Sequence, residues 1–458
     1  MADLMIDLVK NIVSTDYEKL TPESIAYAKE SILDTIGAII AGSTGQGCRE
    51  VVELVKDWGG KKESTILIYG DKVPCATAGL AIGPMARARD IGDVEESGPA
   101  GHITEYILPV AFPVSELRGS VTGKEFITAV ALAQDIMVRL GCSIIKPPDW
   151  PRYTETRIFG PTAVAAKLLL LDEETTLNAM GIAFSQLCGE KQCYKDGALT
   201  VRVEHGFIAN DAIRSVQLAR KGITGAKNIL QGEHGFYAAF EPNYSLTPVV
   251  SGLGKRFDGV KVSIKPYSSC KFGHGAINAT LNIVKKYDVS AENIDKIDVA
   301  VGPMAYRFIC EPKEVKNNPR NIVDCQFSAA YVVANAIVKR KVFIDDFALE
   351  AINRTDVREL INKVNTRIEP DLVTSDNAIG GSVVTIRTKD GKEYSEKVLY
   401  VKGNPKNPMT YEEIAEKFRM CMLFSAKPIH KENVERIIEL VRNLENVSNM
   451  NQVIGLLS

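Results

Sequence analysis

The stretch TPESIAYAKESILDTIGAIIAGS, residues 21–43, sets the character of the first half of the chain. Thr21 can cap a helix, Pro22 suits the first helical position, and isoleucine or alanine then recurs every three or four positions until Gly42. Such a stripe predicts a helix that turns one face to a core. The same pattern recurs in TGKEFITAVALAQDIMVRLG (122–141), GPTAVAAKLLLLD (160–172), EETTLNAMGIAFSQLCG (173–189) and ANDAIRSVQLARKG (209–222).

The pattern changes after Pro248. Alternating or continuous β-branched residues predict strands, and Asp390-Gly391 predicts the turn of a hairpin. The predicted strands are VKVSIKPY (260–267), IDKIDVAVG (294–302) and the hairpin SVVTIRTKDGKEYSEKVLYV (382–401). Helical stretches separate them: GAINATLNIVKKY (275–287), CQFSAAYVVANAIVKR (325–340) and RTDVRELINKVN (354–365). Thr410 and Glu413 then form a capping box that returns the last segment to helix.

A chain of 458 residues exceeds the usual size of a single hydrophobic core, so two domains are expected. The fold class is predicted to be mainly α combined with α+β. An all-helical domain is built from residues 1–262 and 403–458, and a smaller α+β domain spans residues 263–402. We expect the C-terminal segment to fold back onto the first domain.

The charge balance excludes several classes of partner. Fifty-five lysines and arginines face 57 aspartates and glutamates, which leaves no global positive field for nucleic acid or an anionic membrane surface. No apolar run is long enough to span a bilayer, and the N-terminus lacks the basic region of a signal peptide, so a cytoplasmic protein is expected. Nine scattered cysteines without a CxxC pair argue against a disulfide framework or a zinc ribbon. Most are expected to be reduced core residues.

Two of the five histidines stand among charged residues in the first half of the chain. His102 lies in an acidic and glycine-rich stretch, ARARDIGDVEESGPAGHITEY (86–106), which could build a site or be a solvated loop with helix caps. His205 lies in TVRVEHGF with Arg202 and Glu204, a short polar group that a helix is expected to follow after Ala209.

A third candidate is KPYSSCKFGHG, residues 265–275. A strand is expected to end at Lys265-Pro266, and a helix to begin at His274-Gly275. The free amide groups of a helix N-terminus and the cations Lys265 and Lys271 favour a carboxylate or phosphate. A metal site is not expected, because lysine beside the would-be ligands repels a cation. The residues by themselves thus indicate an anion site with acid–base histidines, without naming a reaction.

Segments along nearly the whole chain resemble, in order, those of the MmgE/PrpD family, which includes 2-methylcitrate dehydratase, cis-aconitate decarboxylase and iminodisuccinate epimerase. They are SILDTIGAIIAGS, ARDIGDVEESGPAGH, GKEFITAVALAQDIMVRLG, GIAFSQLCG, DGALTVRVEHGFIANDAI, GITGAKNILQGEHGFY, KPYSSCKFGHGAINA, QFSAAYVVANAIVKRKVFIDDF and EEIAEKFR. The resemblance implies a helical domain of N- and C-terminal segments, an inserted α+β lid and a homodimer. It also implies action on small di- or tricarboxylates with no cofactor, neither metal nor nicotinamide.

The resemblance also implies site residues. Asp90 and Asp93 match the family's acidic motif, and His102 matches the histidine that follows it. Lys265 matches the lysine that opens the lid segment, and Cys270, Lys271 and His274 take its following site positions. Removing a proton next to a carboxylate builds charge on that group, which cations must stabilise while a base takes the proton. His102 is therefore the leading acid–base candidate with Asp93 orienting it, and Lys265, Lys271 and Arg202 are expected to bind substrate carboxylates.

The chain departs from the family pattern at several positions. Gly160, in RIFGPT, stands where many members have a histidine. In VRVEHG (201–206), Val201 replaces a lysine, Glu204 takes the polar position, and His205 replaces a small residue or proline; either polar residue could compensate for the lost histidine. In the acidic motif, Gly92 replaces a carboxylate, and Arg89 stands where leucine is usual.

These features favour a cofactor-independent lyase, a dehydratase or decarboxylase, that acts on a small di- or tricarboxylate. An isomerase or epimerase is the alternative, since reversible α-proton transfer needs only one or two bases. A carboxylate-binding dimeric scaffold without activity is the third.

Overall fold

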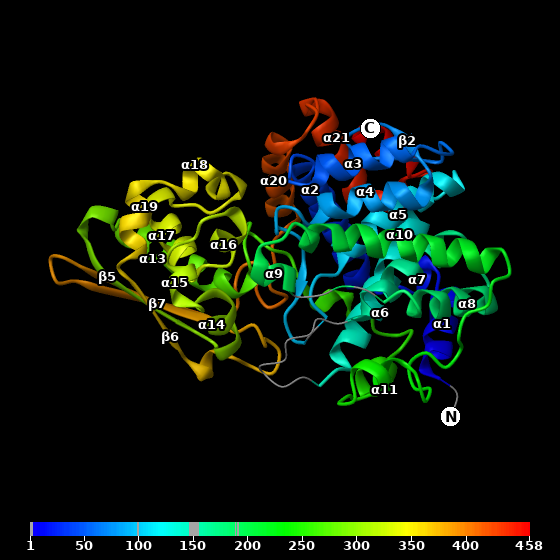
Figure 1. Ribbon diagram of the computed structural model, residues 1–458, viewed down its shortest axis with the longest axis horizontal. Coiled ribbons are helices and arrows are strands. Elements are labelled where there is room, and N and C mark those ends of the chain that lie inside the picture. The colour runs from blue at the N-terminus through cyan, green and yellow to red at the C-terminus, as the bar shows by residue number, and fades with distance from the viewer. Residues whose placement is uncertain (1–2, 99, 146–154, 188, 190–191) are drawn as a thin grey trace. The chain divides into compact units, whose positions relative to one another are not determined.

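The computed structural model describes residues 3–98, 100–145, 155–187, 189 and 192–458 (Figure 1). The chain divides into two compact units. The first contains the described residues up to Ile264 together with Thr410–Ser458, and the second is Lys265–Met409. The change of pattern in the sequence predicts these boundaries at 262/263 and 402/403.

The first unit is built almost entirely of helices (Figure 1). Its longer helices are α1 (Leu4–Ser14), α2 (Pro22–Gly42), α3 (Cys48–Trp58), α4 (Cys75–Arg87), α5 (Thr104–Arg118), α6 (Gly123–Cys142), α7 (Phe159–Leu168), α8 (Glu173–Phe184), α10 (Thr200–Arg220), α20 (Tyr411–Cys421) and α21 (Lys431–Arg442). Helix α2 begins and ends where its sequence predicts, because the Thr21 side chain accepts the amide of Ser24 and Pro22 occupies the first turn. The capping box predicted at Thr410 and Glu413 is also confirmed.

The C-terminal helices return to the first unit and pack on α2. A buried ion pair joins them, because Lys417 Nζ on α20 lies 2.5 Å from Asp34 Oδ1 on α2. The same ammonium donates to the carbonyl of Ile91 at 2.8 Å. The last segment of the chain therefore supports both α2 and the loop that follows α4.

Helix α10 is longer than the sequence predicts. The sequence predicts a short polar group at its first nine residues, with a helix following after Ala209. The β-branched residues and the glycine of TVRVEHG have low helix propensity. They are helical because α10 crosses α4 at two glycines: a Cβ at Gly83 would meet Gly206 N at 2.4 Å, and one at Gly206 would meet Leu80 O at 2.4 Å. This close packing overrides the weak local propensity and places Arg202, Glu204 and His205 on a helix.

Two short strands lie beside the loop after α4. Strand β3 (Val94–Glu95) pairs antiparallel with β4 (Val262–Ser263). The strand predicted over 260–267 is therefore wrong except at its centre; the residues before it form the 3-10 turn η3 (Asp258–Lys261). Long-range pairing with β3, and not alternation alone, decides where β4 begins and ends.

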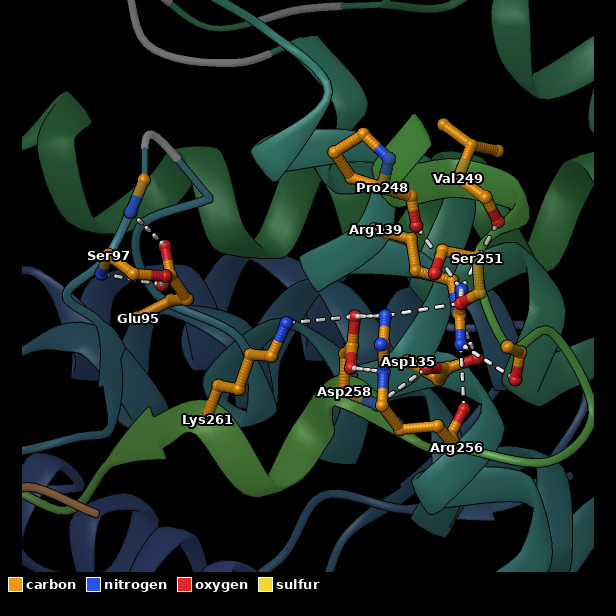
Figure 2. Close-up of polar contacts among 12 residues, drawn as sticks. Glu95, Ser97, Asp135, Arg139, Pro248, Val249, Ser251, Arg256, Asp258 and Lys261 are labelled. Atoms are coloured by element: carbon orange, nitrogen blue, oxygen red, sulfur yellow. Dashed lines mark hydrogen bonds and ion pairs between the residues drawn. The ribbon is translucent and has the colours of Figure 1, made fainter. Parts of the chain in front are cut away.

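Figure 2 shows how the segment before β4 is fixed to α6. The fully buried Arg139 guanidinium contacts Asp135 Oδ2 at 2.8 Å and donates to the main-chain carbonyls of Pro248, Val249, Ser251, Gly252 and Arg256. Asp135 Oδ1 accepts the amide of Asp258 at 2.6 Å. Because one buried cation satisfies so many carbonyls, this irregular segment is held in one conformation.

The second unit has a four-stranded sheet in the order β6-β5-β7-β8. Its strands are β5 (Ile294–Val301), β6 (Val364–Ile368), β7 (Ser382–Thr388) and β8 (Glu393–Val398). The predicted hairpin is confirmed, with Gly391 at a φ of 82° in its turn. The helical stretch predicted over 354–365 is wrong at Val364 and Asn365, which begin strand β6, and β6 pairs parallel with β5. Helices α13 (His274–Tyr287), α17 (Ala329–Lys339) and α19 (Thr355–Ile361) pack with the sheet into one hydrophobic core.

The predicted fold class, mainly α combined with α+β, is confirmed. No helix within the described parts of the chain is long and apolar enough to cross a membrane. Of the nine cysteines, Cys188 lies outside the described residues. Among those described, all but Cys142 are buried, and none forms a disulfide.

Candidate active site

The loop between α4 and α5 carries Asp90, Asp93 and His102. Asp93 is fully buried, and its carboxylate accepts the amides of Ile103 and Thr104 at the start of α5, together with the Thr104 hydroxyl. The Asp93 carboxylate thus anchors the helix that follows His102. The contact of Asp93 with the His102 ring is made by its main-chain carbonyl and not by its carboxylate.

The pKa of the Asp93 carboxyl is strongly shifted from its usual value. Burial raises its pKa from 3.8 to about 7, and the charge of nearby Glu105 adds to the rise, while the Thr104 hydrogen bonds oppose both. Burial disfavours the ionised form of an acid, whereas donors stabilise it. Asp93 therefore titrates close to neutral pH in a fully buried position.

His102 is held by its Nδ1 atom. That atom lies 2.8 Å from the main-chain carbonyl of Asp93, and a carbonyl can only accept, so Nδ1 carries the hydrogen. Glu105 Oε1 lies 3.3 Å from the same nitrogen. Nε2 is then the nitrogen that gains or loses a proton, 4.0 Å from Asp90 Oδ1. The contacts at Nδ1 thus fix the orientation of the imidazole.

Arg87 ties the loop to α4. Its Nη1 lies 2.5 Å from Asp90 Oδ1, and its Nε lies 3.7 Å from Glu105 Oε1. Asp90 has a φ of 49°, a left-handed conformation that non-glycine residues adopt at a cost, and its ion pair with the buried Arg87 holds it there. One guanidinium thereby links both carboxylates that lie closest to His102.

His205 lies under this group and is fully buried. Its Nε2 is 2.9 Å from Glu105 Oε1, and its ring stacks on Tyr106 with centroids 3.8 Å apart. Burial, and next the charges of Arg87 and Arg157, lower the pKa of His205 well below 6.5. Neutral His205 donates a hydrogen bond from Nε2 to Glu105 and so stabilises that carboxylate. Because its pKa is lowered, His205 is not readily protonated.

Arg202 on α10 and Arg89 in the loop after α4 have hydrogen-bond partners of their own. Arg202 is buried and donates to Gln46 O at 2.6 Å; burial lowers its pKa. Arg89 donates to Ala41 O at 2.9 Å and to the Thr44 hydroxyl at 2.7 Å. Glu204 is buried on the same helix as Arg202. The structure thus places Asp90 4.0 Å from His102 and brings both His102 and His205 to Glu105. The roles of Arg202, Arg89 and Glu204 in binding substrate stay predictions.

The family histidine that Gly160 replaces has no room in this chain. A Cβ at Gly160 would lie 2.4 Å from Met137 Cγ and Sδ and 3.0 Å from the carbonyl of Ala133. Met137 is buried on α6 and fills the space that a side chain on α7 would need.

We therefore expect Gly160→His to destabilise the protein by about 1–3 kcal/mol, since a well-packed core resists added volume. Thermal unfolding measures the effect. Gly455→His is the matched control, because a Cβ at Gly455 meets nothing within 4 Å, and it should leave the midpoint almost unchanged. Equal midpoints for both variants would contradict this account of the packing.

Three candidates of the second unit, Cys270, Lys271 and His274, lie at the start of α13, where the predicted helix start at His274 is confirmed. Lys265, Cys270, Lys271 and His274 are all buried. His274 Nε2 lies 3.0 Å from the Ser269 carbonyl and therefore carries a hydrogen, and its ring meets Tyr267 edge-on at 5.2 Å. His274 fixes this turn. That this group and the His102 group act on one substrate remains a prediction.

Reasoning from the sequence missed Glu105, Arg87 and Tyr106. Glu105 carries the only signal that could have been read: a glutamate three positions after His102, at the start of a helix, is placed to meet it. The stacking of Tyr106 on His205 joins α5 to α10 and cannot be read from either segment alone. Within the described residues, no group of three or more His, Cys, Asp or Glu side chains is arranged to hold a metal ion.

Two family domains match the chain in sequence. The MmgE/PrpD N-terminal domain matches residues 7–248, and the MmgE/PrpD C-terminal domain matches residues 267–446. The chain belongs to the MmgE/PrpD family. Among the curated proteins similar to this MmgE/PrpD chain are two cis-aconitate decarboxylases, each 25% identical. That of Aspergillus terreus covers 94% of this chain and 91% of its own length, and that of Homo sapiens covers 96% and 91%. The cis-aconitate decarboxylase-like protein oryM of Aspergillus oryzae is also 25% identical, over 94% of this chain and 92% of its own.

Proposed function

We propose that this MmgE/PrpD protein is a lyase that acts on a small di- or tricarboxylate, with loss of CO₂ as the first expectation and loss of water as the other reaction of the class. The family supports an enzyme of the lyase or dehydratase type. The names of the full-length relatives favour decarboxylation.

The orientation of His102 carries the proposal. Its Nδ1–H is fixed on the Asp93 carbonyl at 2.8 Å, so Nε2 is the atom that exchanges a proton with a substrate. When CO₂ leaves, the electron pair of the broken C–C bond stays on the substrate, and protonated Nε2 donates a proton to the carbon that receives it. When water leaves, neutral Nε2 removes the proton next to a carboxylate, the C–O bond on the neighbouring carbon breaks, and the protonated histidine returns the proton to the departing hydroxide. Either step is general acid–base catalysis by one positioned histidine.

Substrate carboxylates need cations. Lys265, Lys271 and Arg202 are proposed to bind them, because buried lysine and arginine side chains attract anions most strongly where water is excluded. We propose that the protein needs no metal or nicotinamide for this chemistry and that it forms a homodimer, as the family resemblance implies.

Proton NMR in D₂O tests the proposal on a panel of citrate, 2-methylcitrate, cis-aconitate, malate and amino-dicarboxylates. We expect one compound to lose CO₂ or water. Exchange of an α-hydrogen for deuterium without any change of carbon skeleton would instead establish an epimerase. No reaction across the panel by the folded protein would contradict the proposed lyase.

A further inference from the structure

Glu105 connects the acid–base candidate with the buried histidine beneath it. Its Oε1 atom lies 3.3 Å from His102 Nδ1, 2.9 Å from His205 Nε2 and 3.7 Å from Arg87 Nε. The side chain of Glu105 is fully buried. Of the three contacts, that with His205 is a hydrogen bond, whereas Arg87 lies beyond hydrogen-bond distance and acts through its charge. His102 Nδ1 lies near the same oxygen while it donates to the Asp93 carbonyl.

The second oxygen of Glu105 points to Gly92. A Cβ built on Gly92 would lie 2.3 Å from Glu105 Oε2, and its three nearest atoms all belong to Glu105. Gly92 is the position at which the acidic motif of this chain lacks a carboxylate. The volume next to Gly92 that a side chain would fill is therefore occupied by a carboxylate from α5.

We propose that Glu105 is a positioning residue for His102 and supplies the carboxylate that the acidic motif lacks at position 92. This inference rests on the proposed function of His102. Glu105 holds the imidazole by Nδ1, together with the Asp93 carbonyl, and its negative charge favours the protonated ring. His205 stacks on Tyr106 and donates a hydrogen bond to Glu105, which restrains the Glu105 carboxylate.

The charge around His102 comes from four elements. Asp90 and Asp93 belong to its own loop, Glu105 to α5, Arg87 to α4, and His205 and Arg202 to α10. Arg87 offsets part of the charge of Asp90 and Glu105, and His205 is neutral because burial lowers its pKa. Removing Glu105 therefore removes a nearby negative charge that Arg87 only partly balances.

Three variants at positions 92 and 105 test the inference. Glu105→Ala removes the carboxylate, Gly92→Asp adds one at the motif position, and the double variant moves it from α5 to the loop. Gly92 does not have a left-handed backbone, and the three atoms nearest to a Cβ at this position all belong to the Glu105 side chain. Gly92→Asp alone should lower the unfolding temperature, because two carboxylates would share one space.

An NMR titration of the histidine signals in isotope-labelled protein tests the inference without a substrate. The chain has five histidines, and the spectrum of His102→Gln assigns the His102 signals. We expect Glu105→Ala to move the His102 titration to lower pH and the double variant to move it back. Glu116→Ala is the control on the same helix: Glu116 contacts Thr65 and Lys72, so its loss should leave the His102 signals in place.

Turnover provides the second readout. In Glu105→Ala we expect kcat to fall about 10- to 100-fold with a smaller change of KM, as for other outer partners of functional histidines. The double variant should recover part of that loss. If Glu105→Ala fails to fold, Glu105→Gln keeps the shape, removes the charge and gives the same comparison.

An unchanged His102 titration in Glu105→Ala or Glu105→Gln would overturn the inference. A double variant that recovers neither the titration nor kcat would overturn the exchange between positions 92 and 105. Absence of turnover in the unmodified protein would count against the proposed lyase alone, because the NMR comparison still decides the role of Glu105.

Discussion

His102→Gln is expected to lower kcat by about 10²- to 10⁴-fold, the usual contribution of a general acid–base group. The amide of glutamine can keep a contact to the Asp93 carbonyl, but it cannot exchange a proton at the position of Nε2. Since the substitution leaves the cationic candidates intact, KM should change much less than kcat.

His430→Gln is the matched control for this variant. His430 is exposed and precedes helix α21, and the His102 group does not include it. Both variants should unfold at nearly the temperature of the unmodified protein. Normal turnover by folded His102→Gln would show that His102 is not the acid–base group, and His274 would become the next candidate.

The second large effect concerns stability. Lys417→Met should lower the free energy of unfolding of the helical unit by about 3–5 kcal/mol, because it takes away the cation that Asp34 contacts at 2.5 Å in a buried position. Hydrogen exchange of the α2 amides or thermal unfolding measures the loss. The loop carbonyl of Ile91 loses its donor at the same time, so the site loop should exchange faster as well.

Two comparisons sharpen this test. Arg49→Met removes one partner of an exposed pair with Glu53 and should cost no more than about 0.5 kcal/mol. Lys417→Met combined with Asp34→Leu should recover part of the lost stability, since it leaves no buried carboxylate. If Lys417→Met behaved like Arg49→Met, the C-terminal helices would not support α2 as described.

Local signals allowed much of the fold to be predicted. Helix α2 and the capping box at Thr410 depend on neighbouring residues, and the hairpin turn depends on Asp390-Gly391, so each could be read from the sequence. Strand β6 was missed because its partner β5 lies more than 60 residues away and decides its conformation. The start of α10 was missed because the contact of Gly83 with Gly206 joins two distant helices.

The candidate site could be predicted in its residues but not in its connections. The motif around Asp93 and His102 indicated an acid–base loop, yet it gave no sign that the Asp93 carbonyl would hold the imidazole. In the sequence, Gly92 and Gly160 each indicate the loss of a functional side chain. In three dimensions they differ: Glu105 brings a carboxylate to the space beside Gly92, whereas Met137 fills the space beside Gly160 with an apolar side chain.

The most direct test of the proposed function uses cis-aconitate labelled with ¹³C in its carboxylates, followed by ¹³C NMR with the unmodified protein and with His102→Gln. We predict that labelled cis-aconitate or another carboxylate of the panel loses CO₂ or water with the unmodified protein, and that this loss falls at least about 100-fold with His102→Gln. Intact cis-aconitate after prolonged incubation, together with no loss of water or CO₂ from any other carboxylate of the panel, would contradict it.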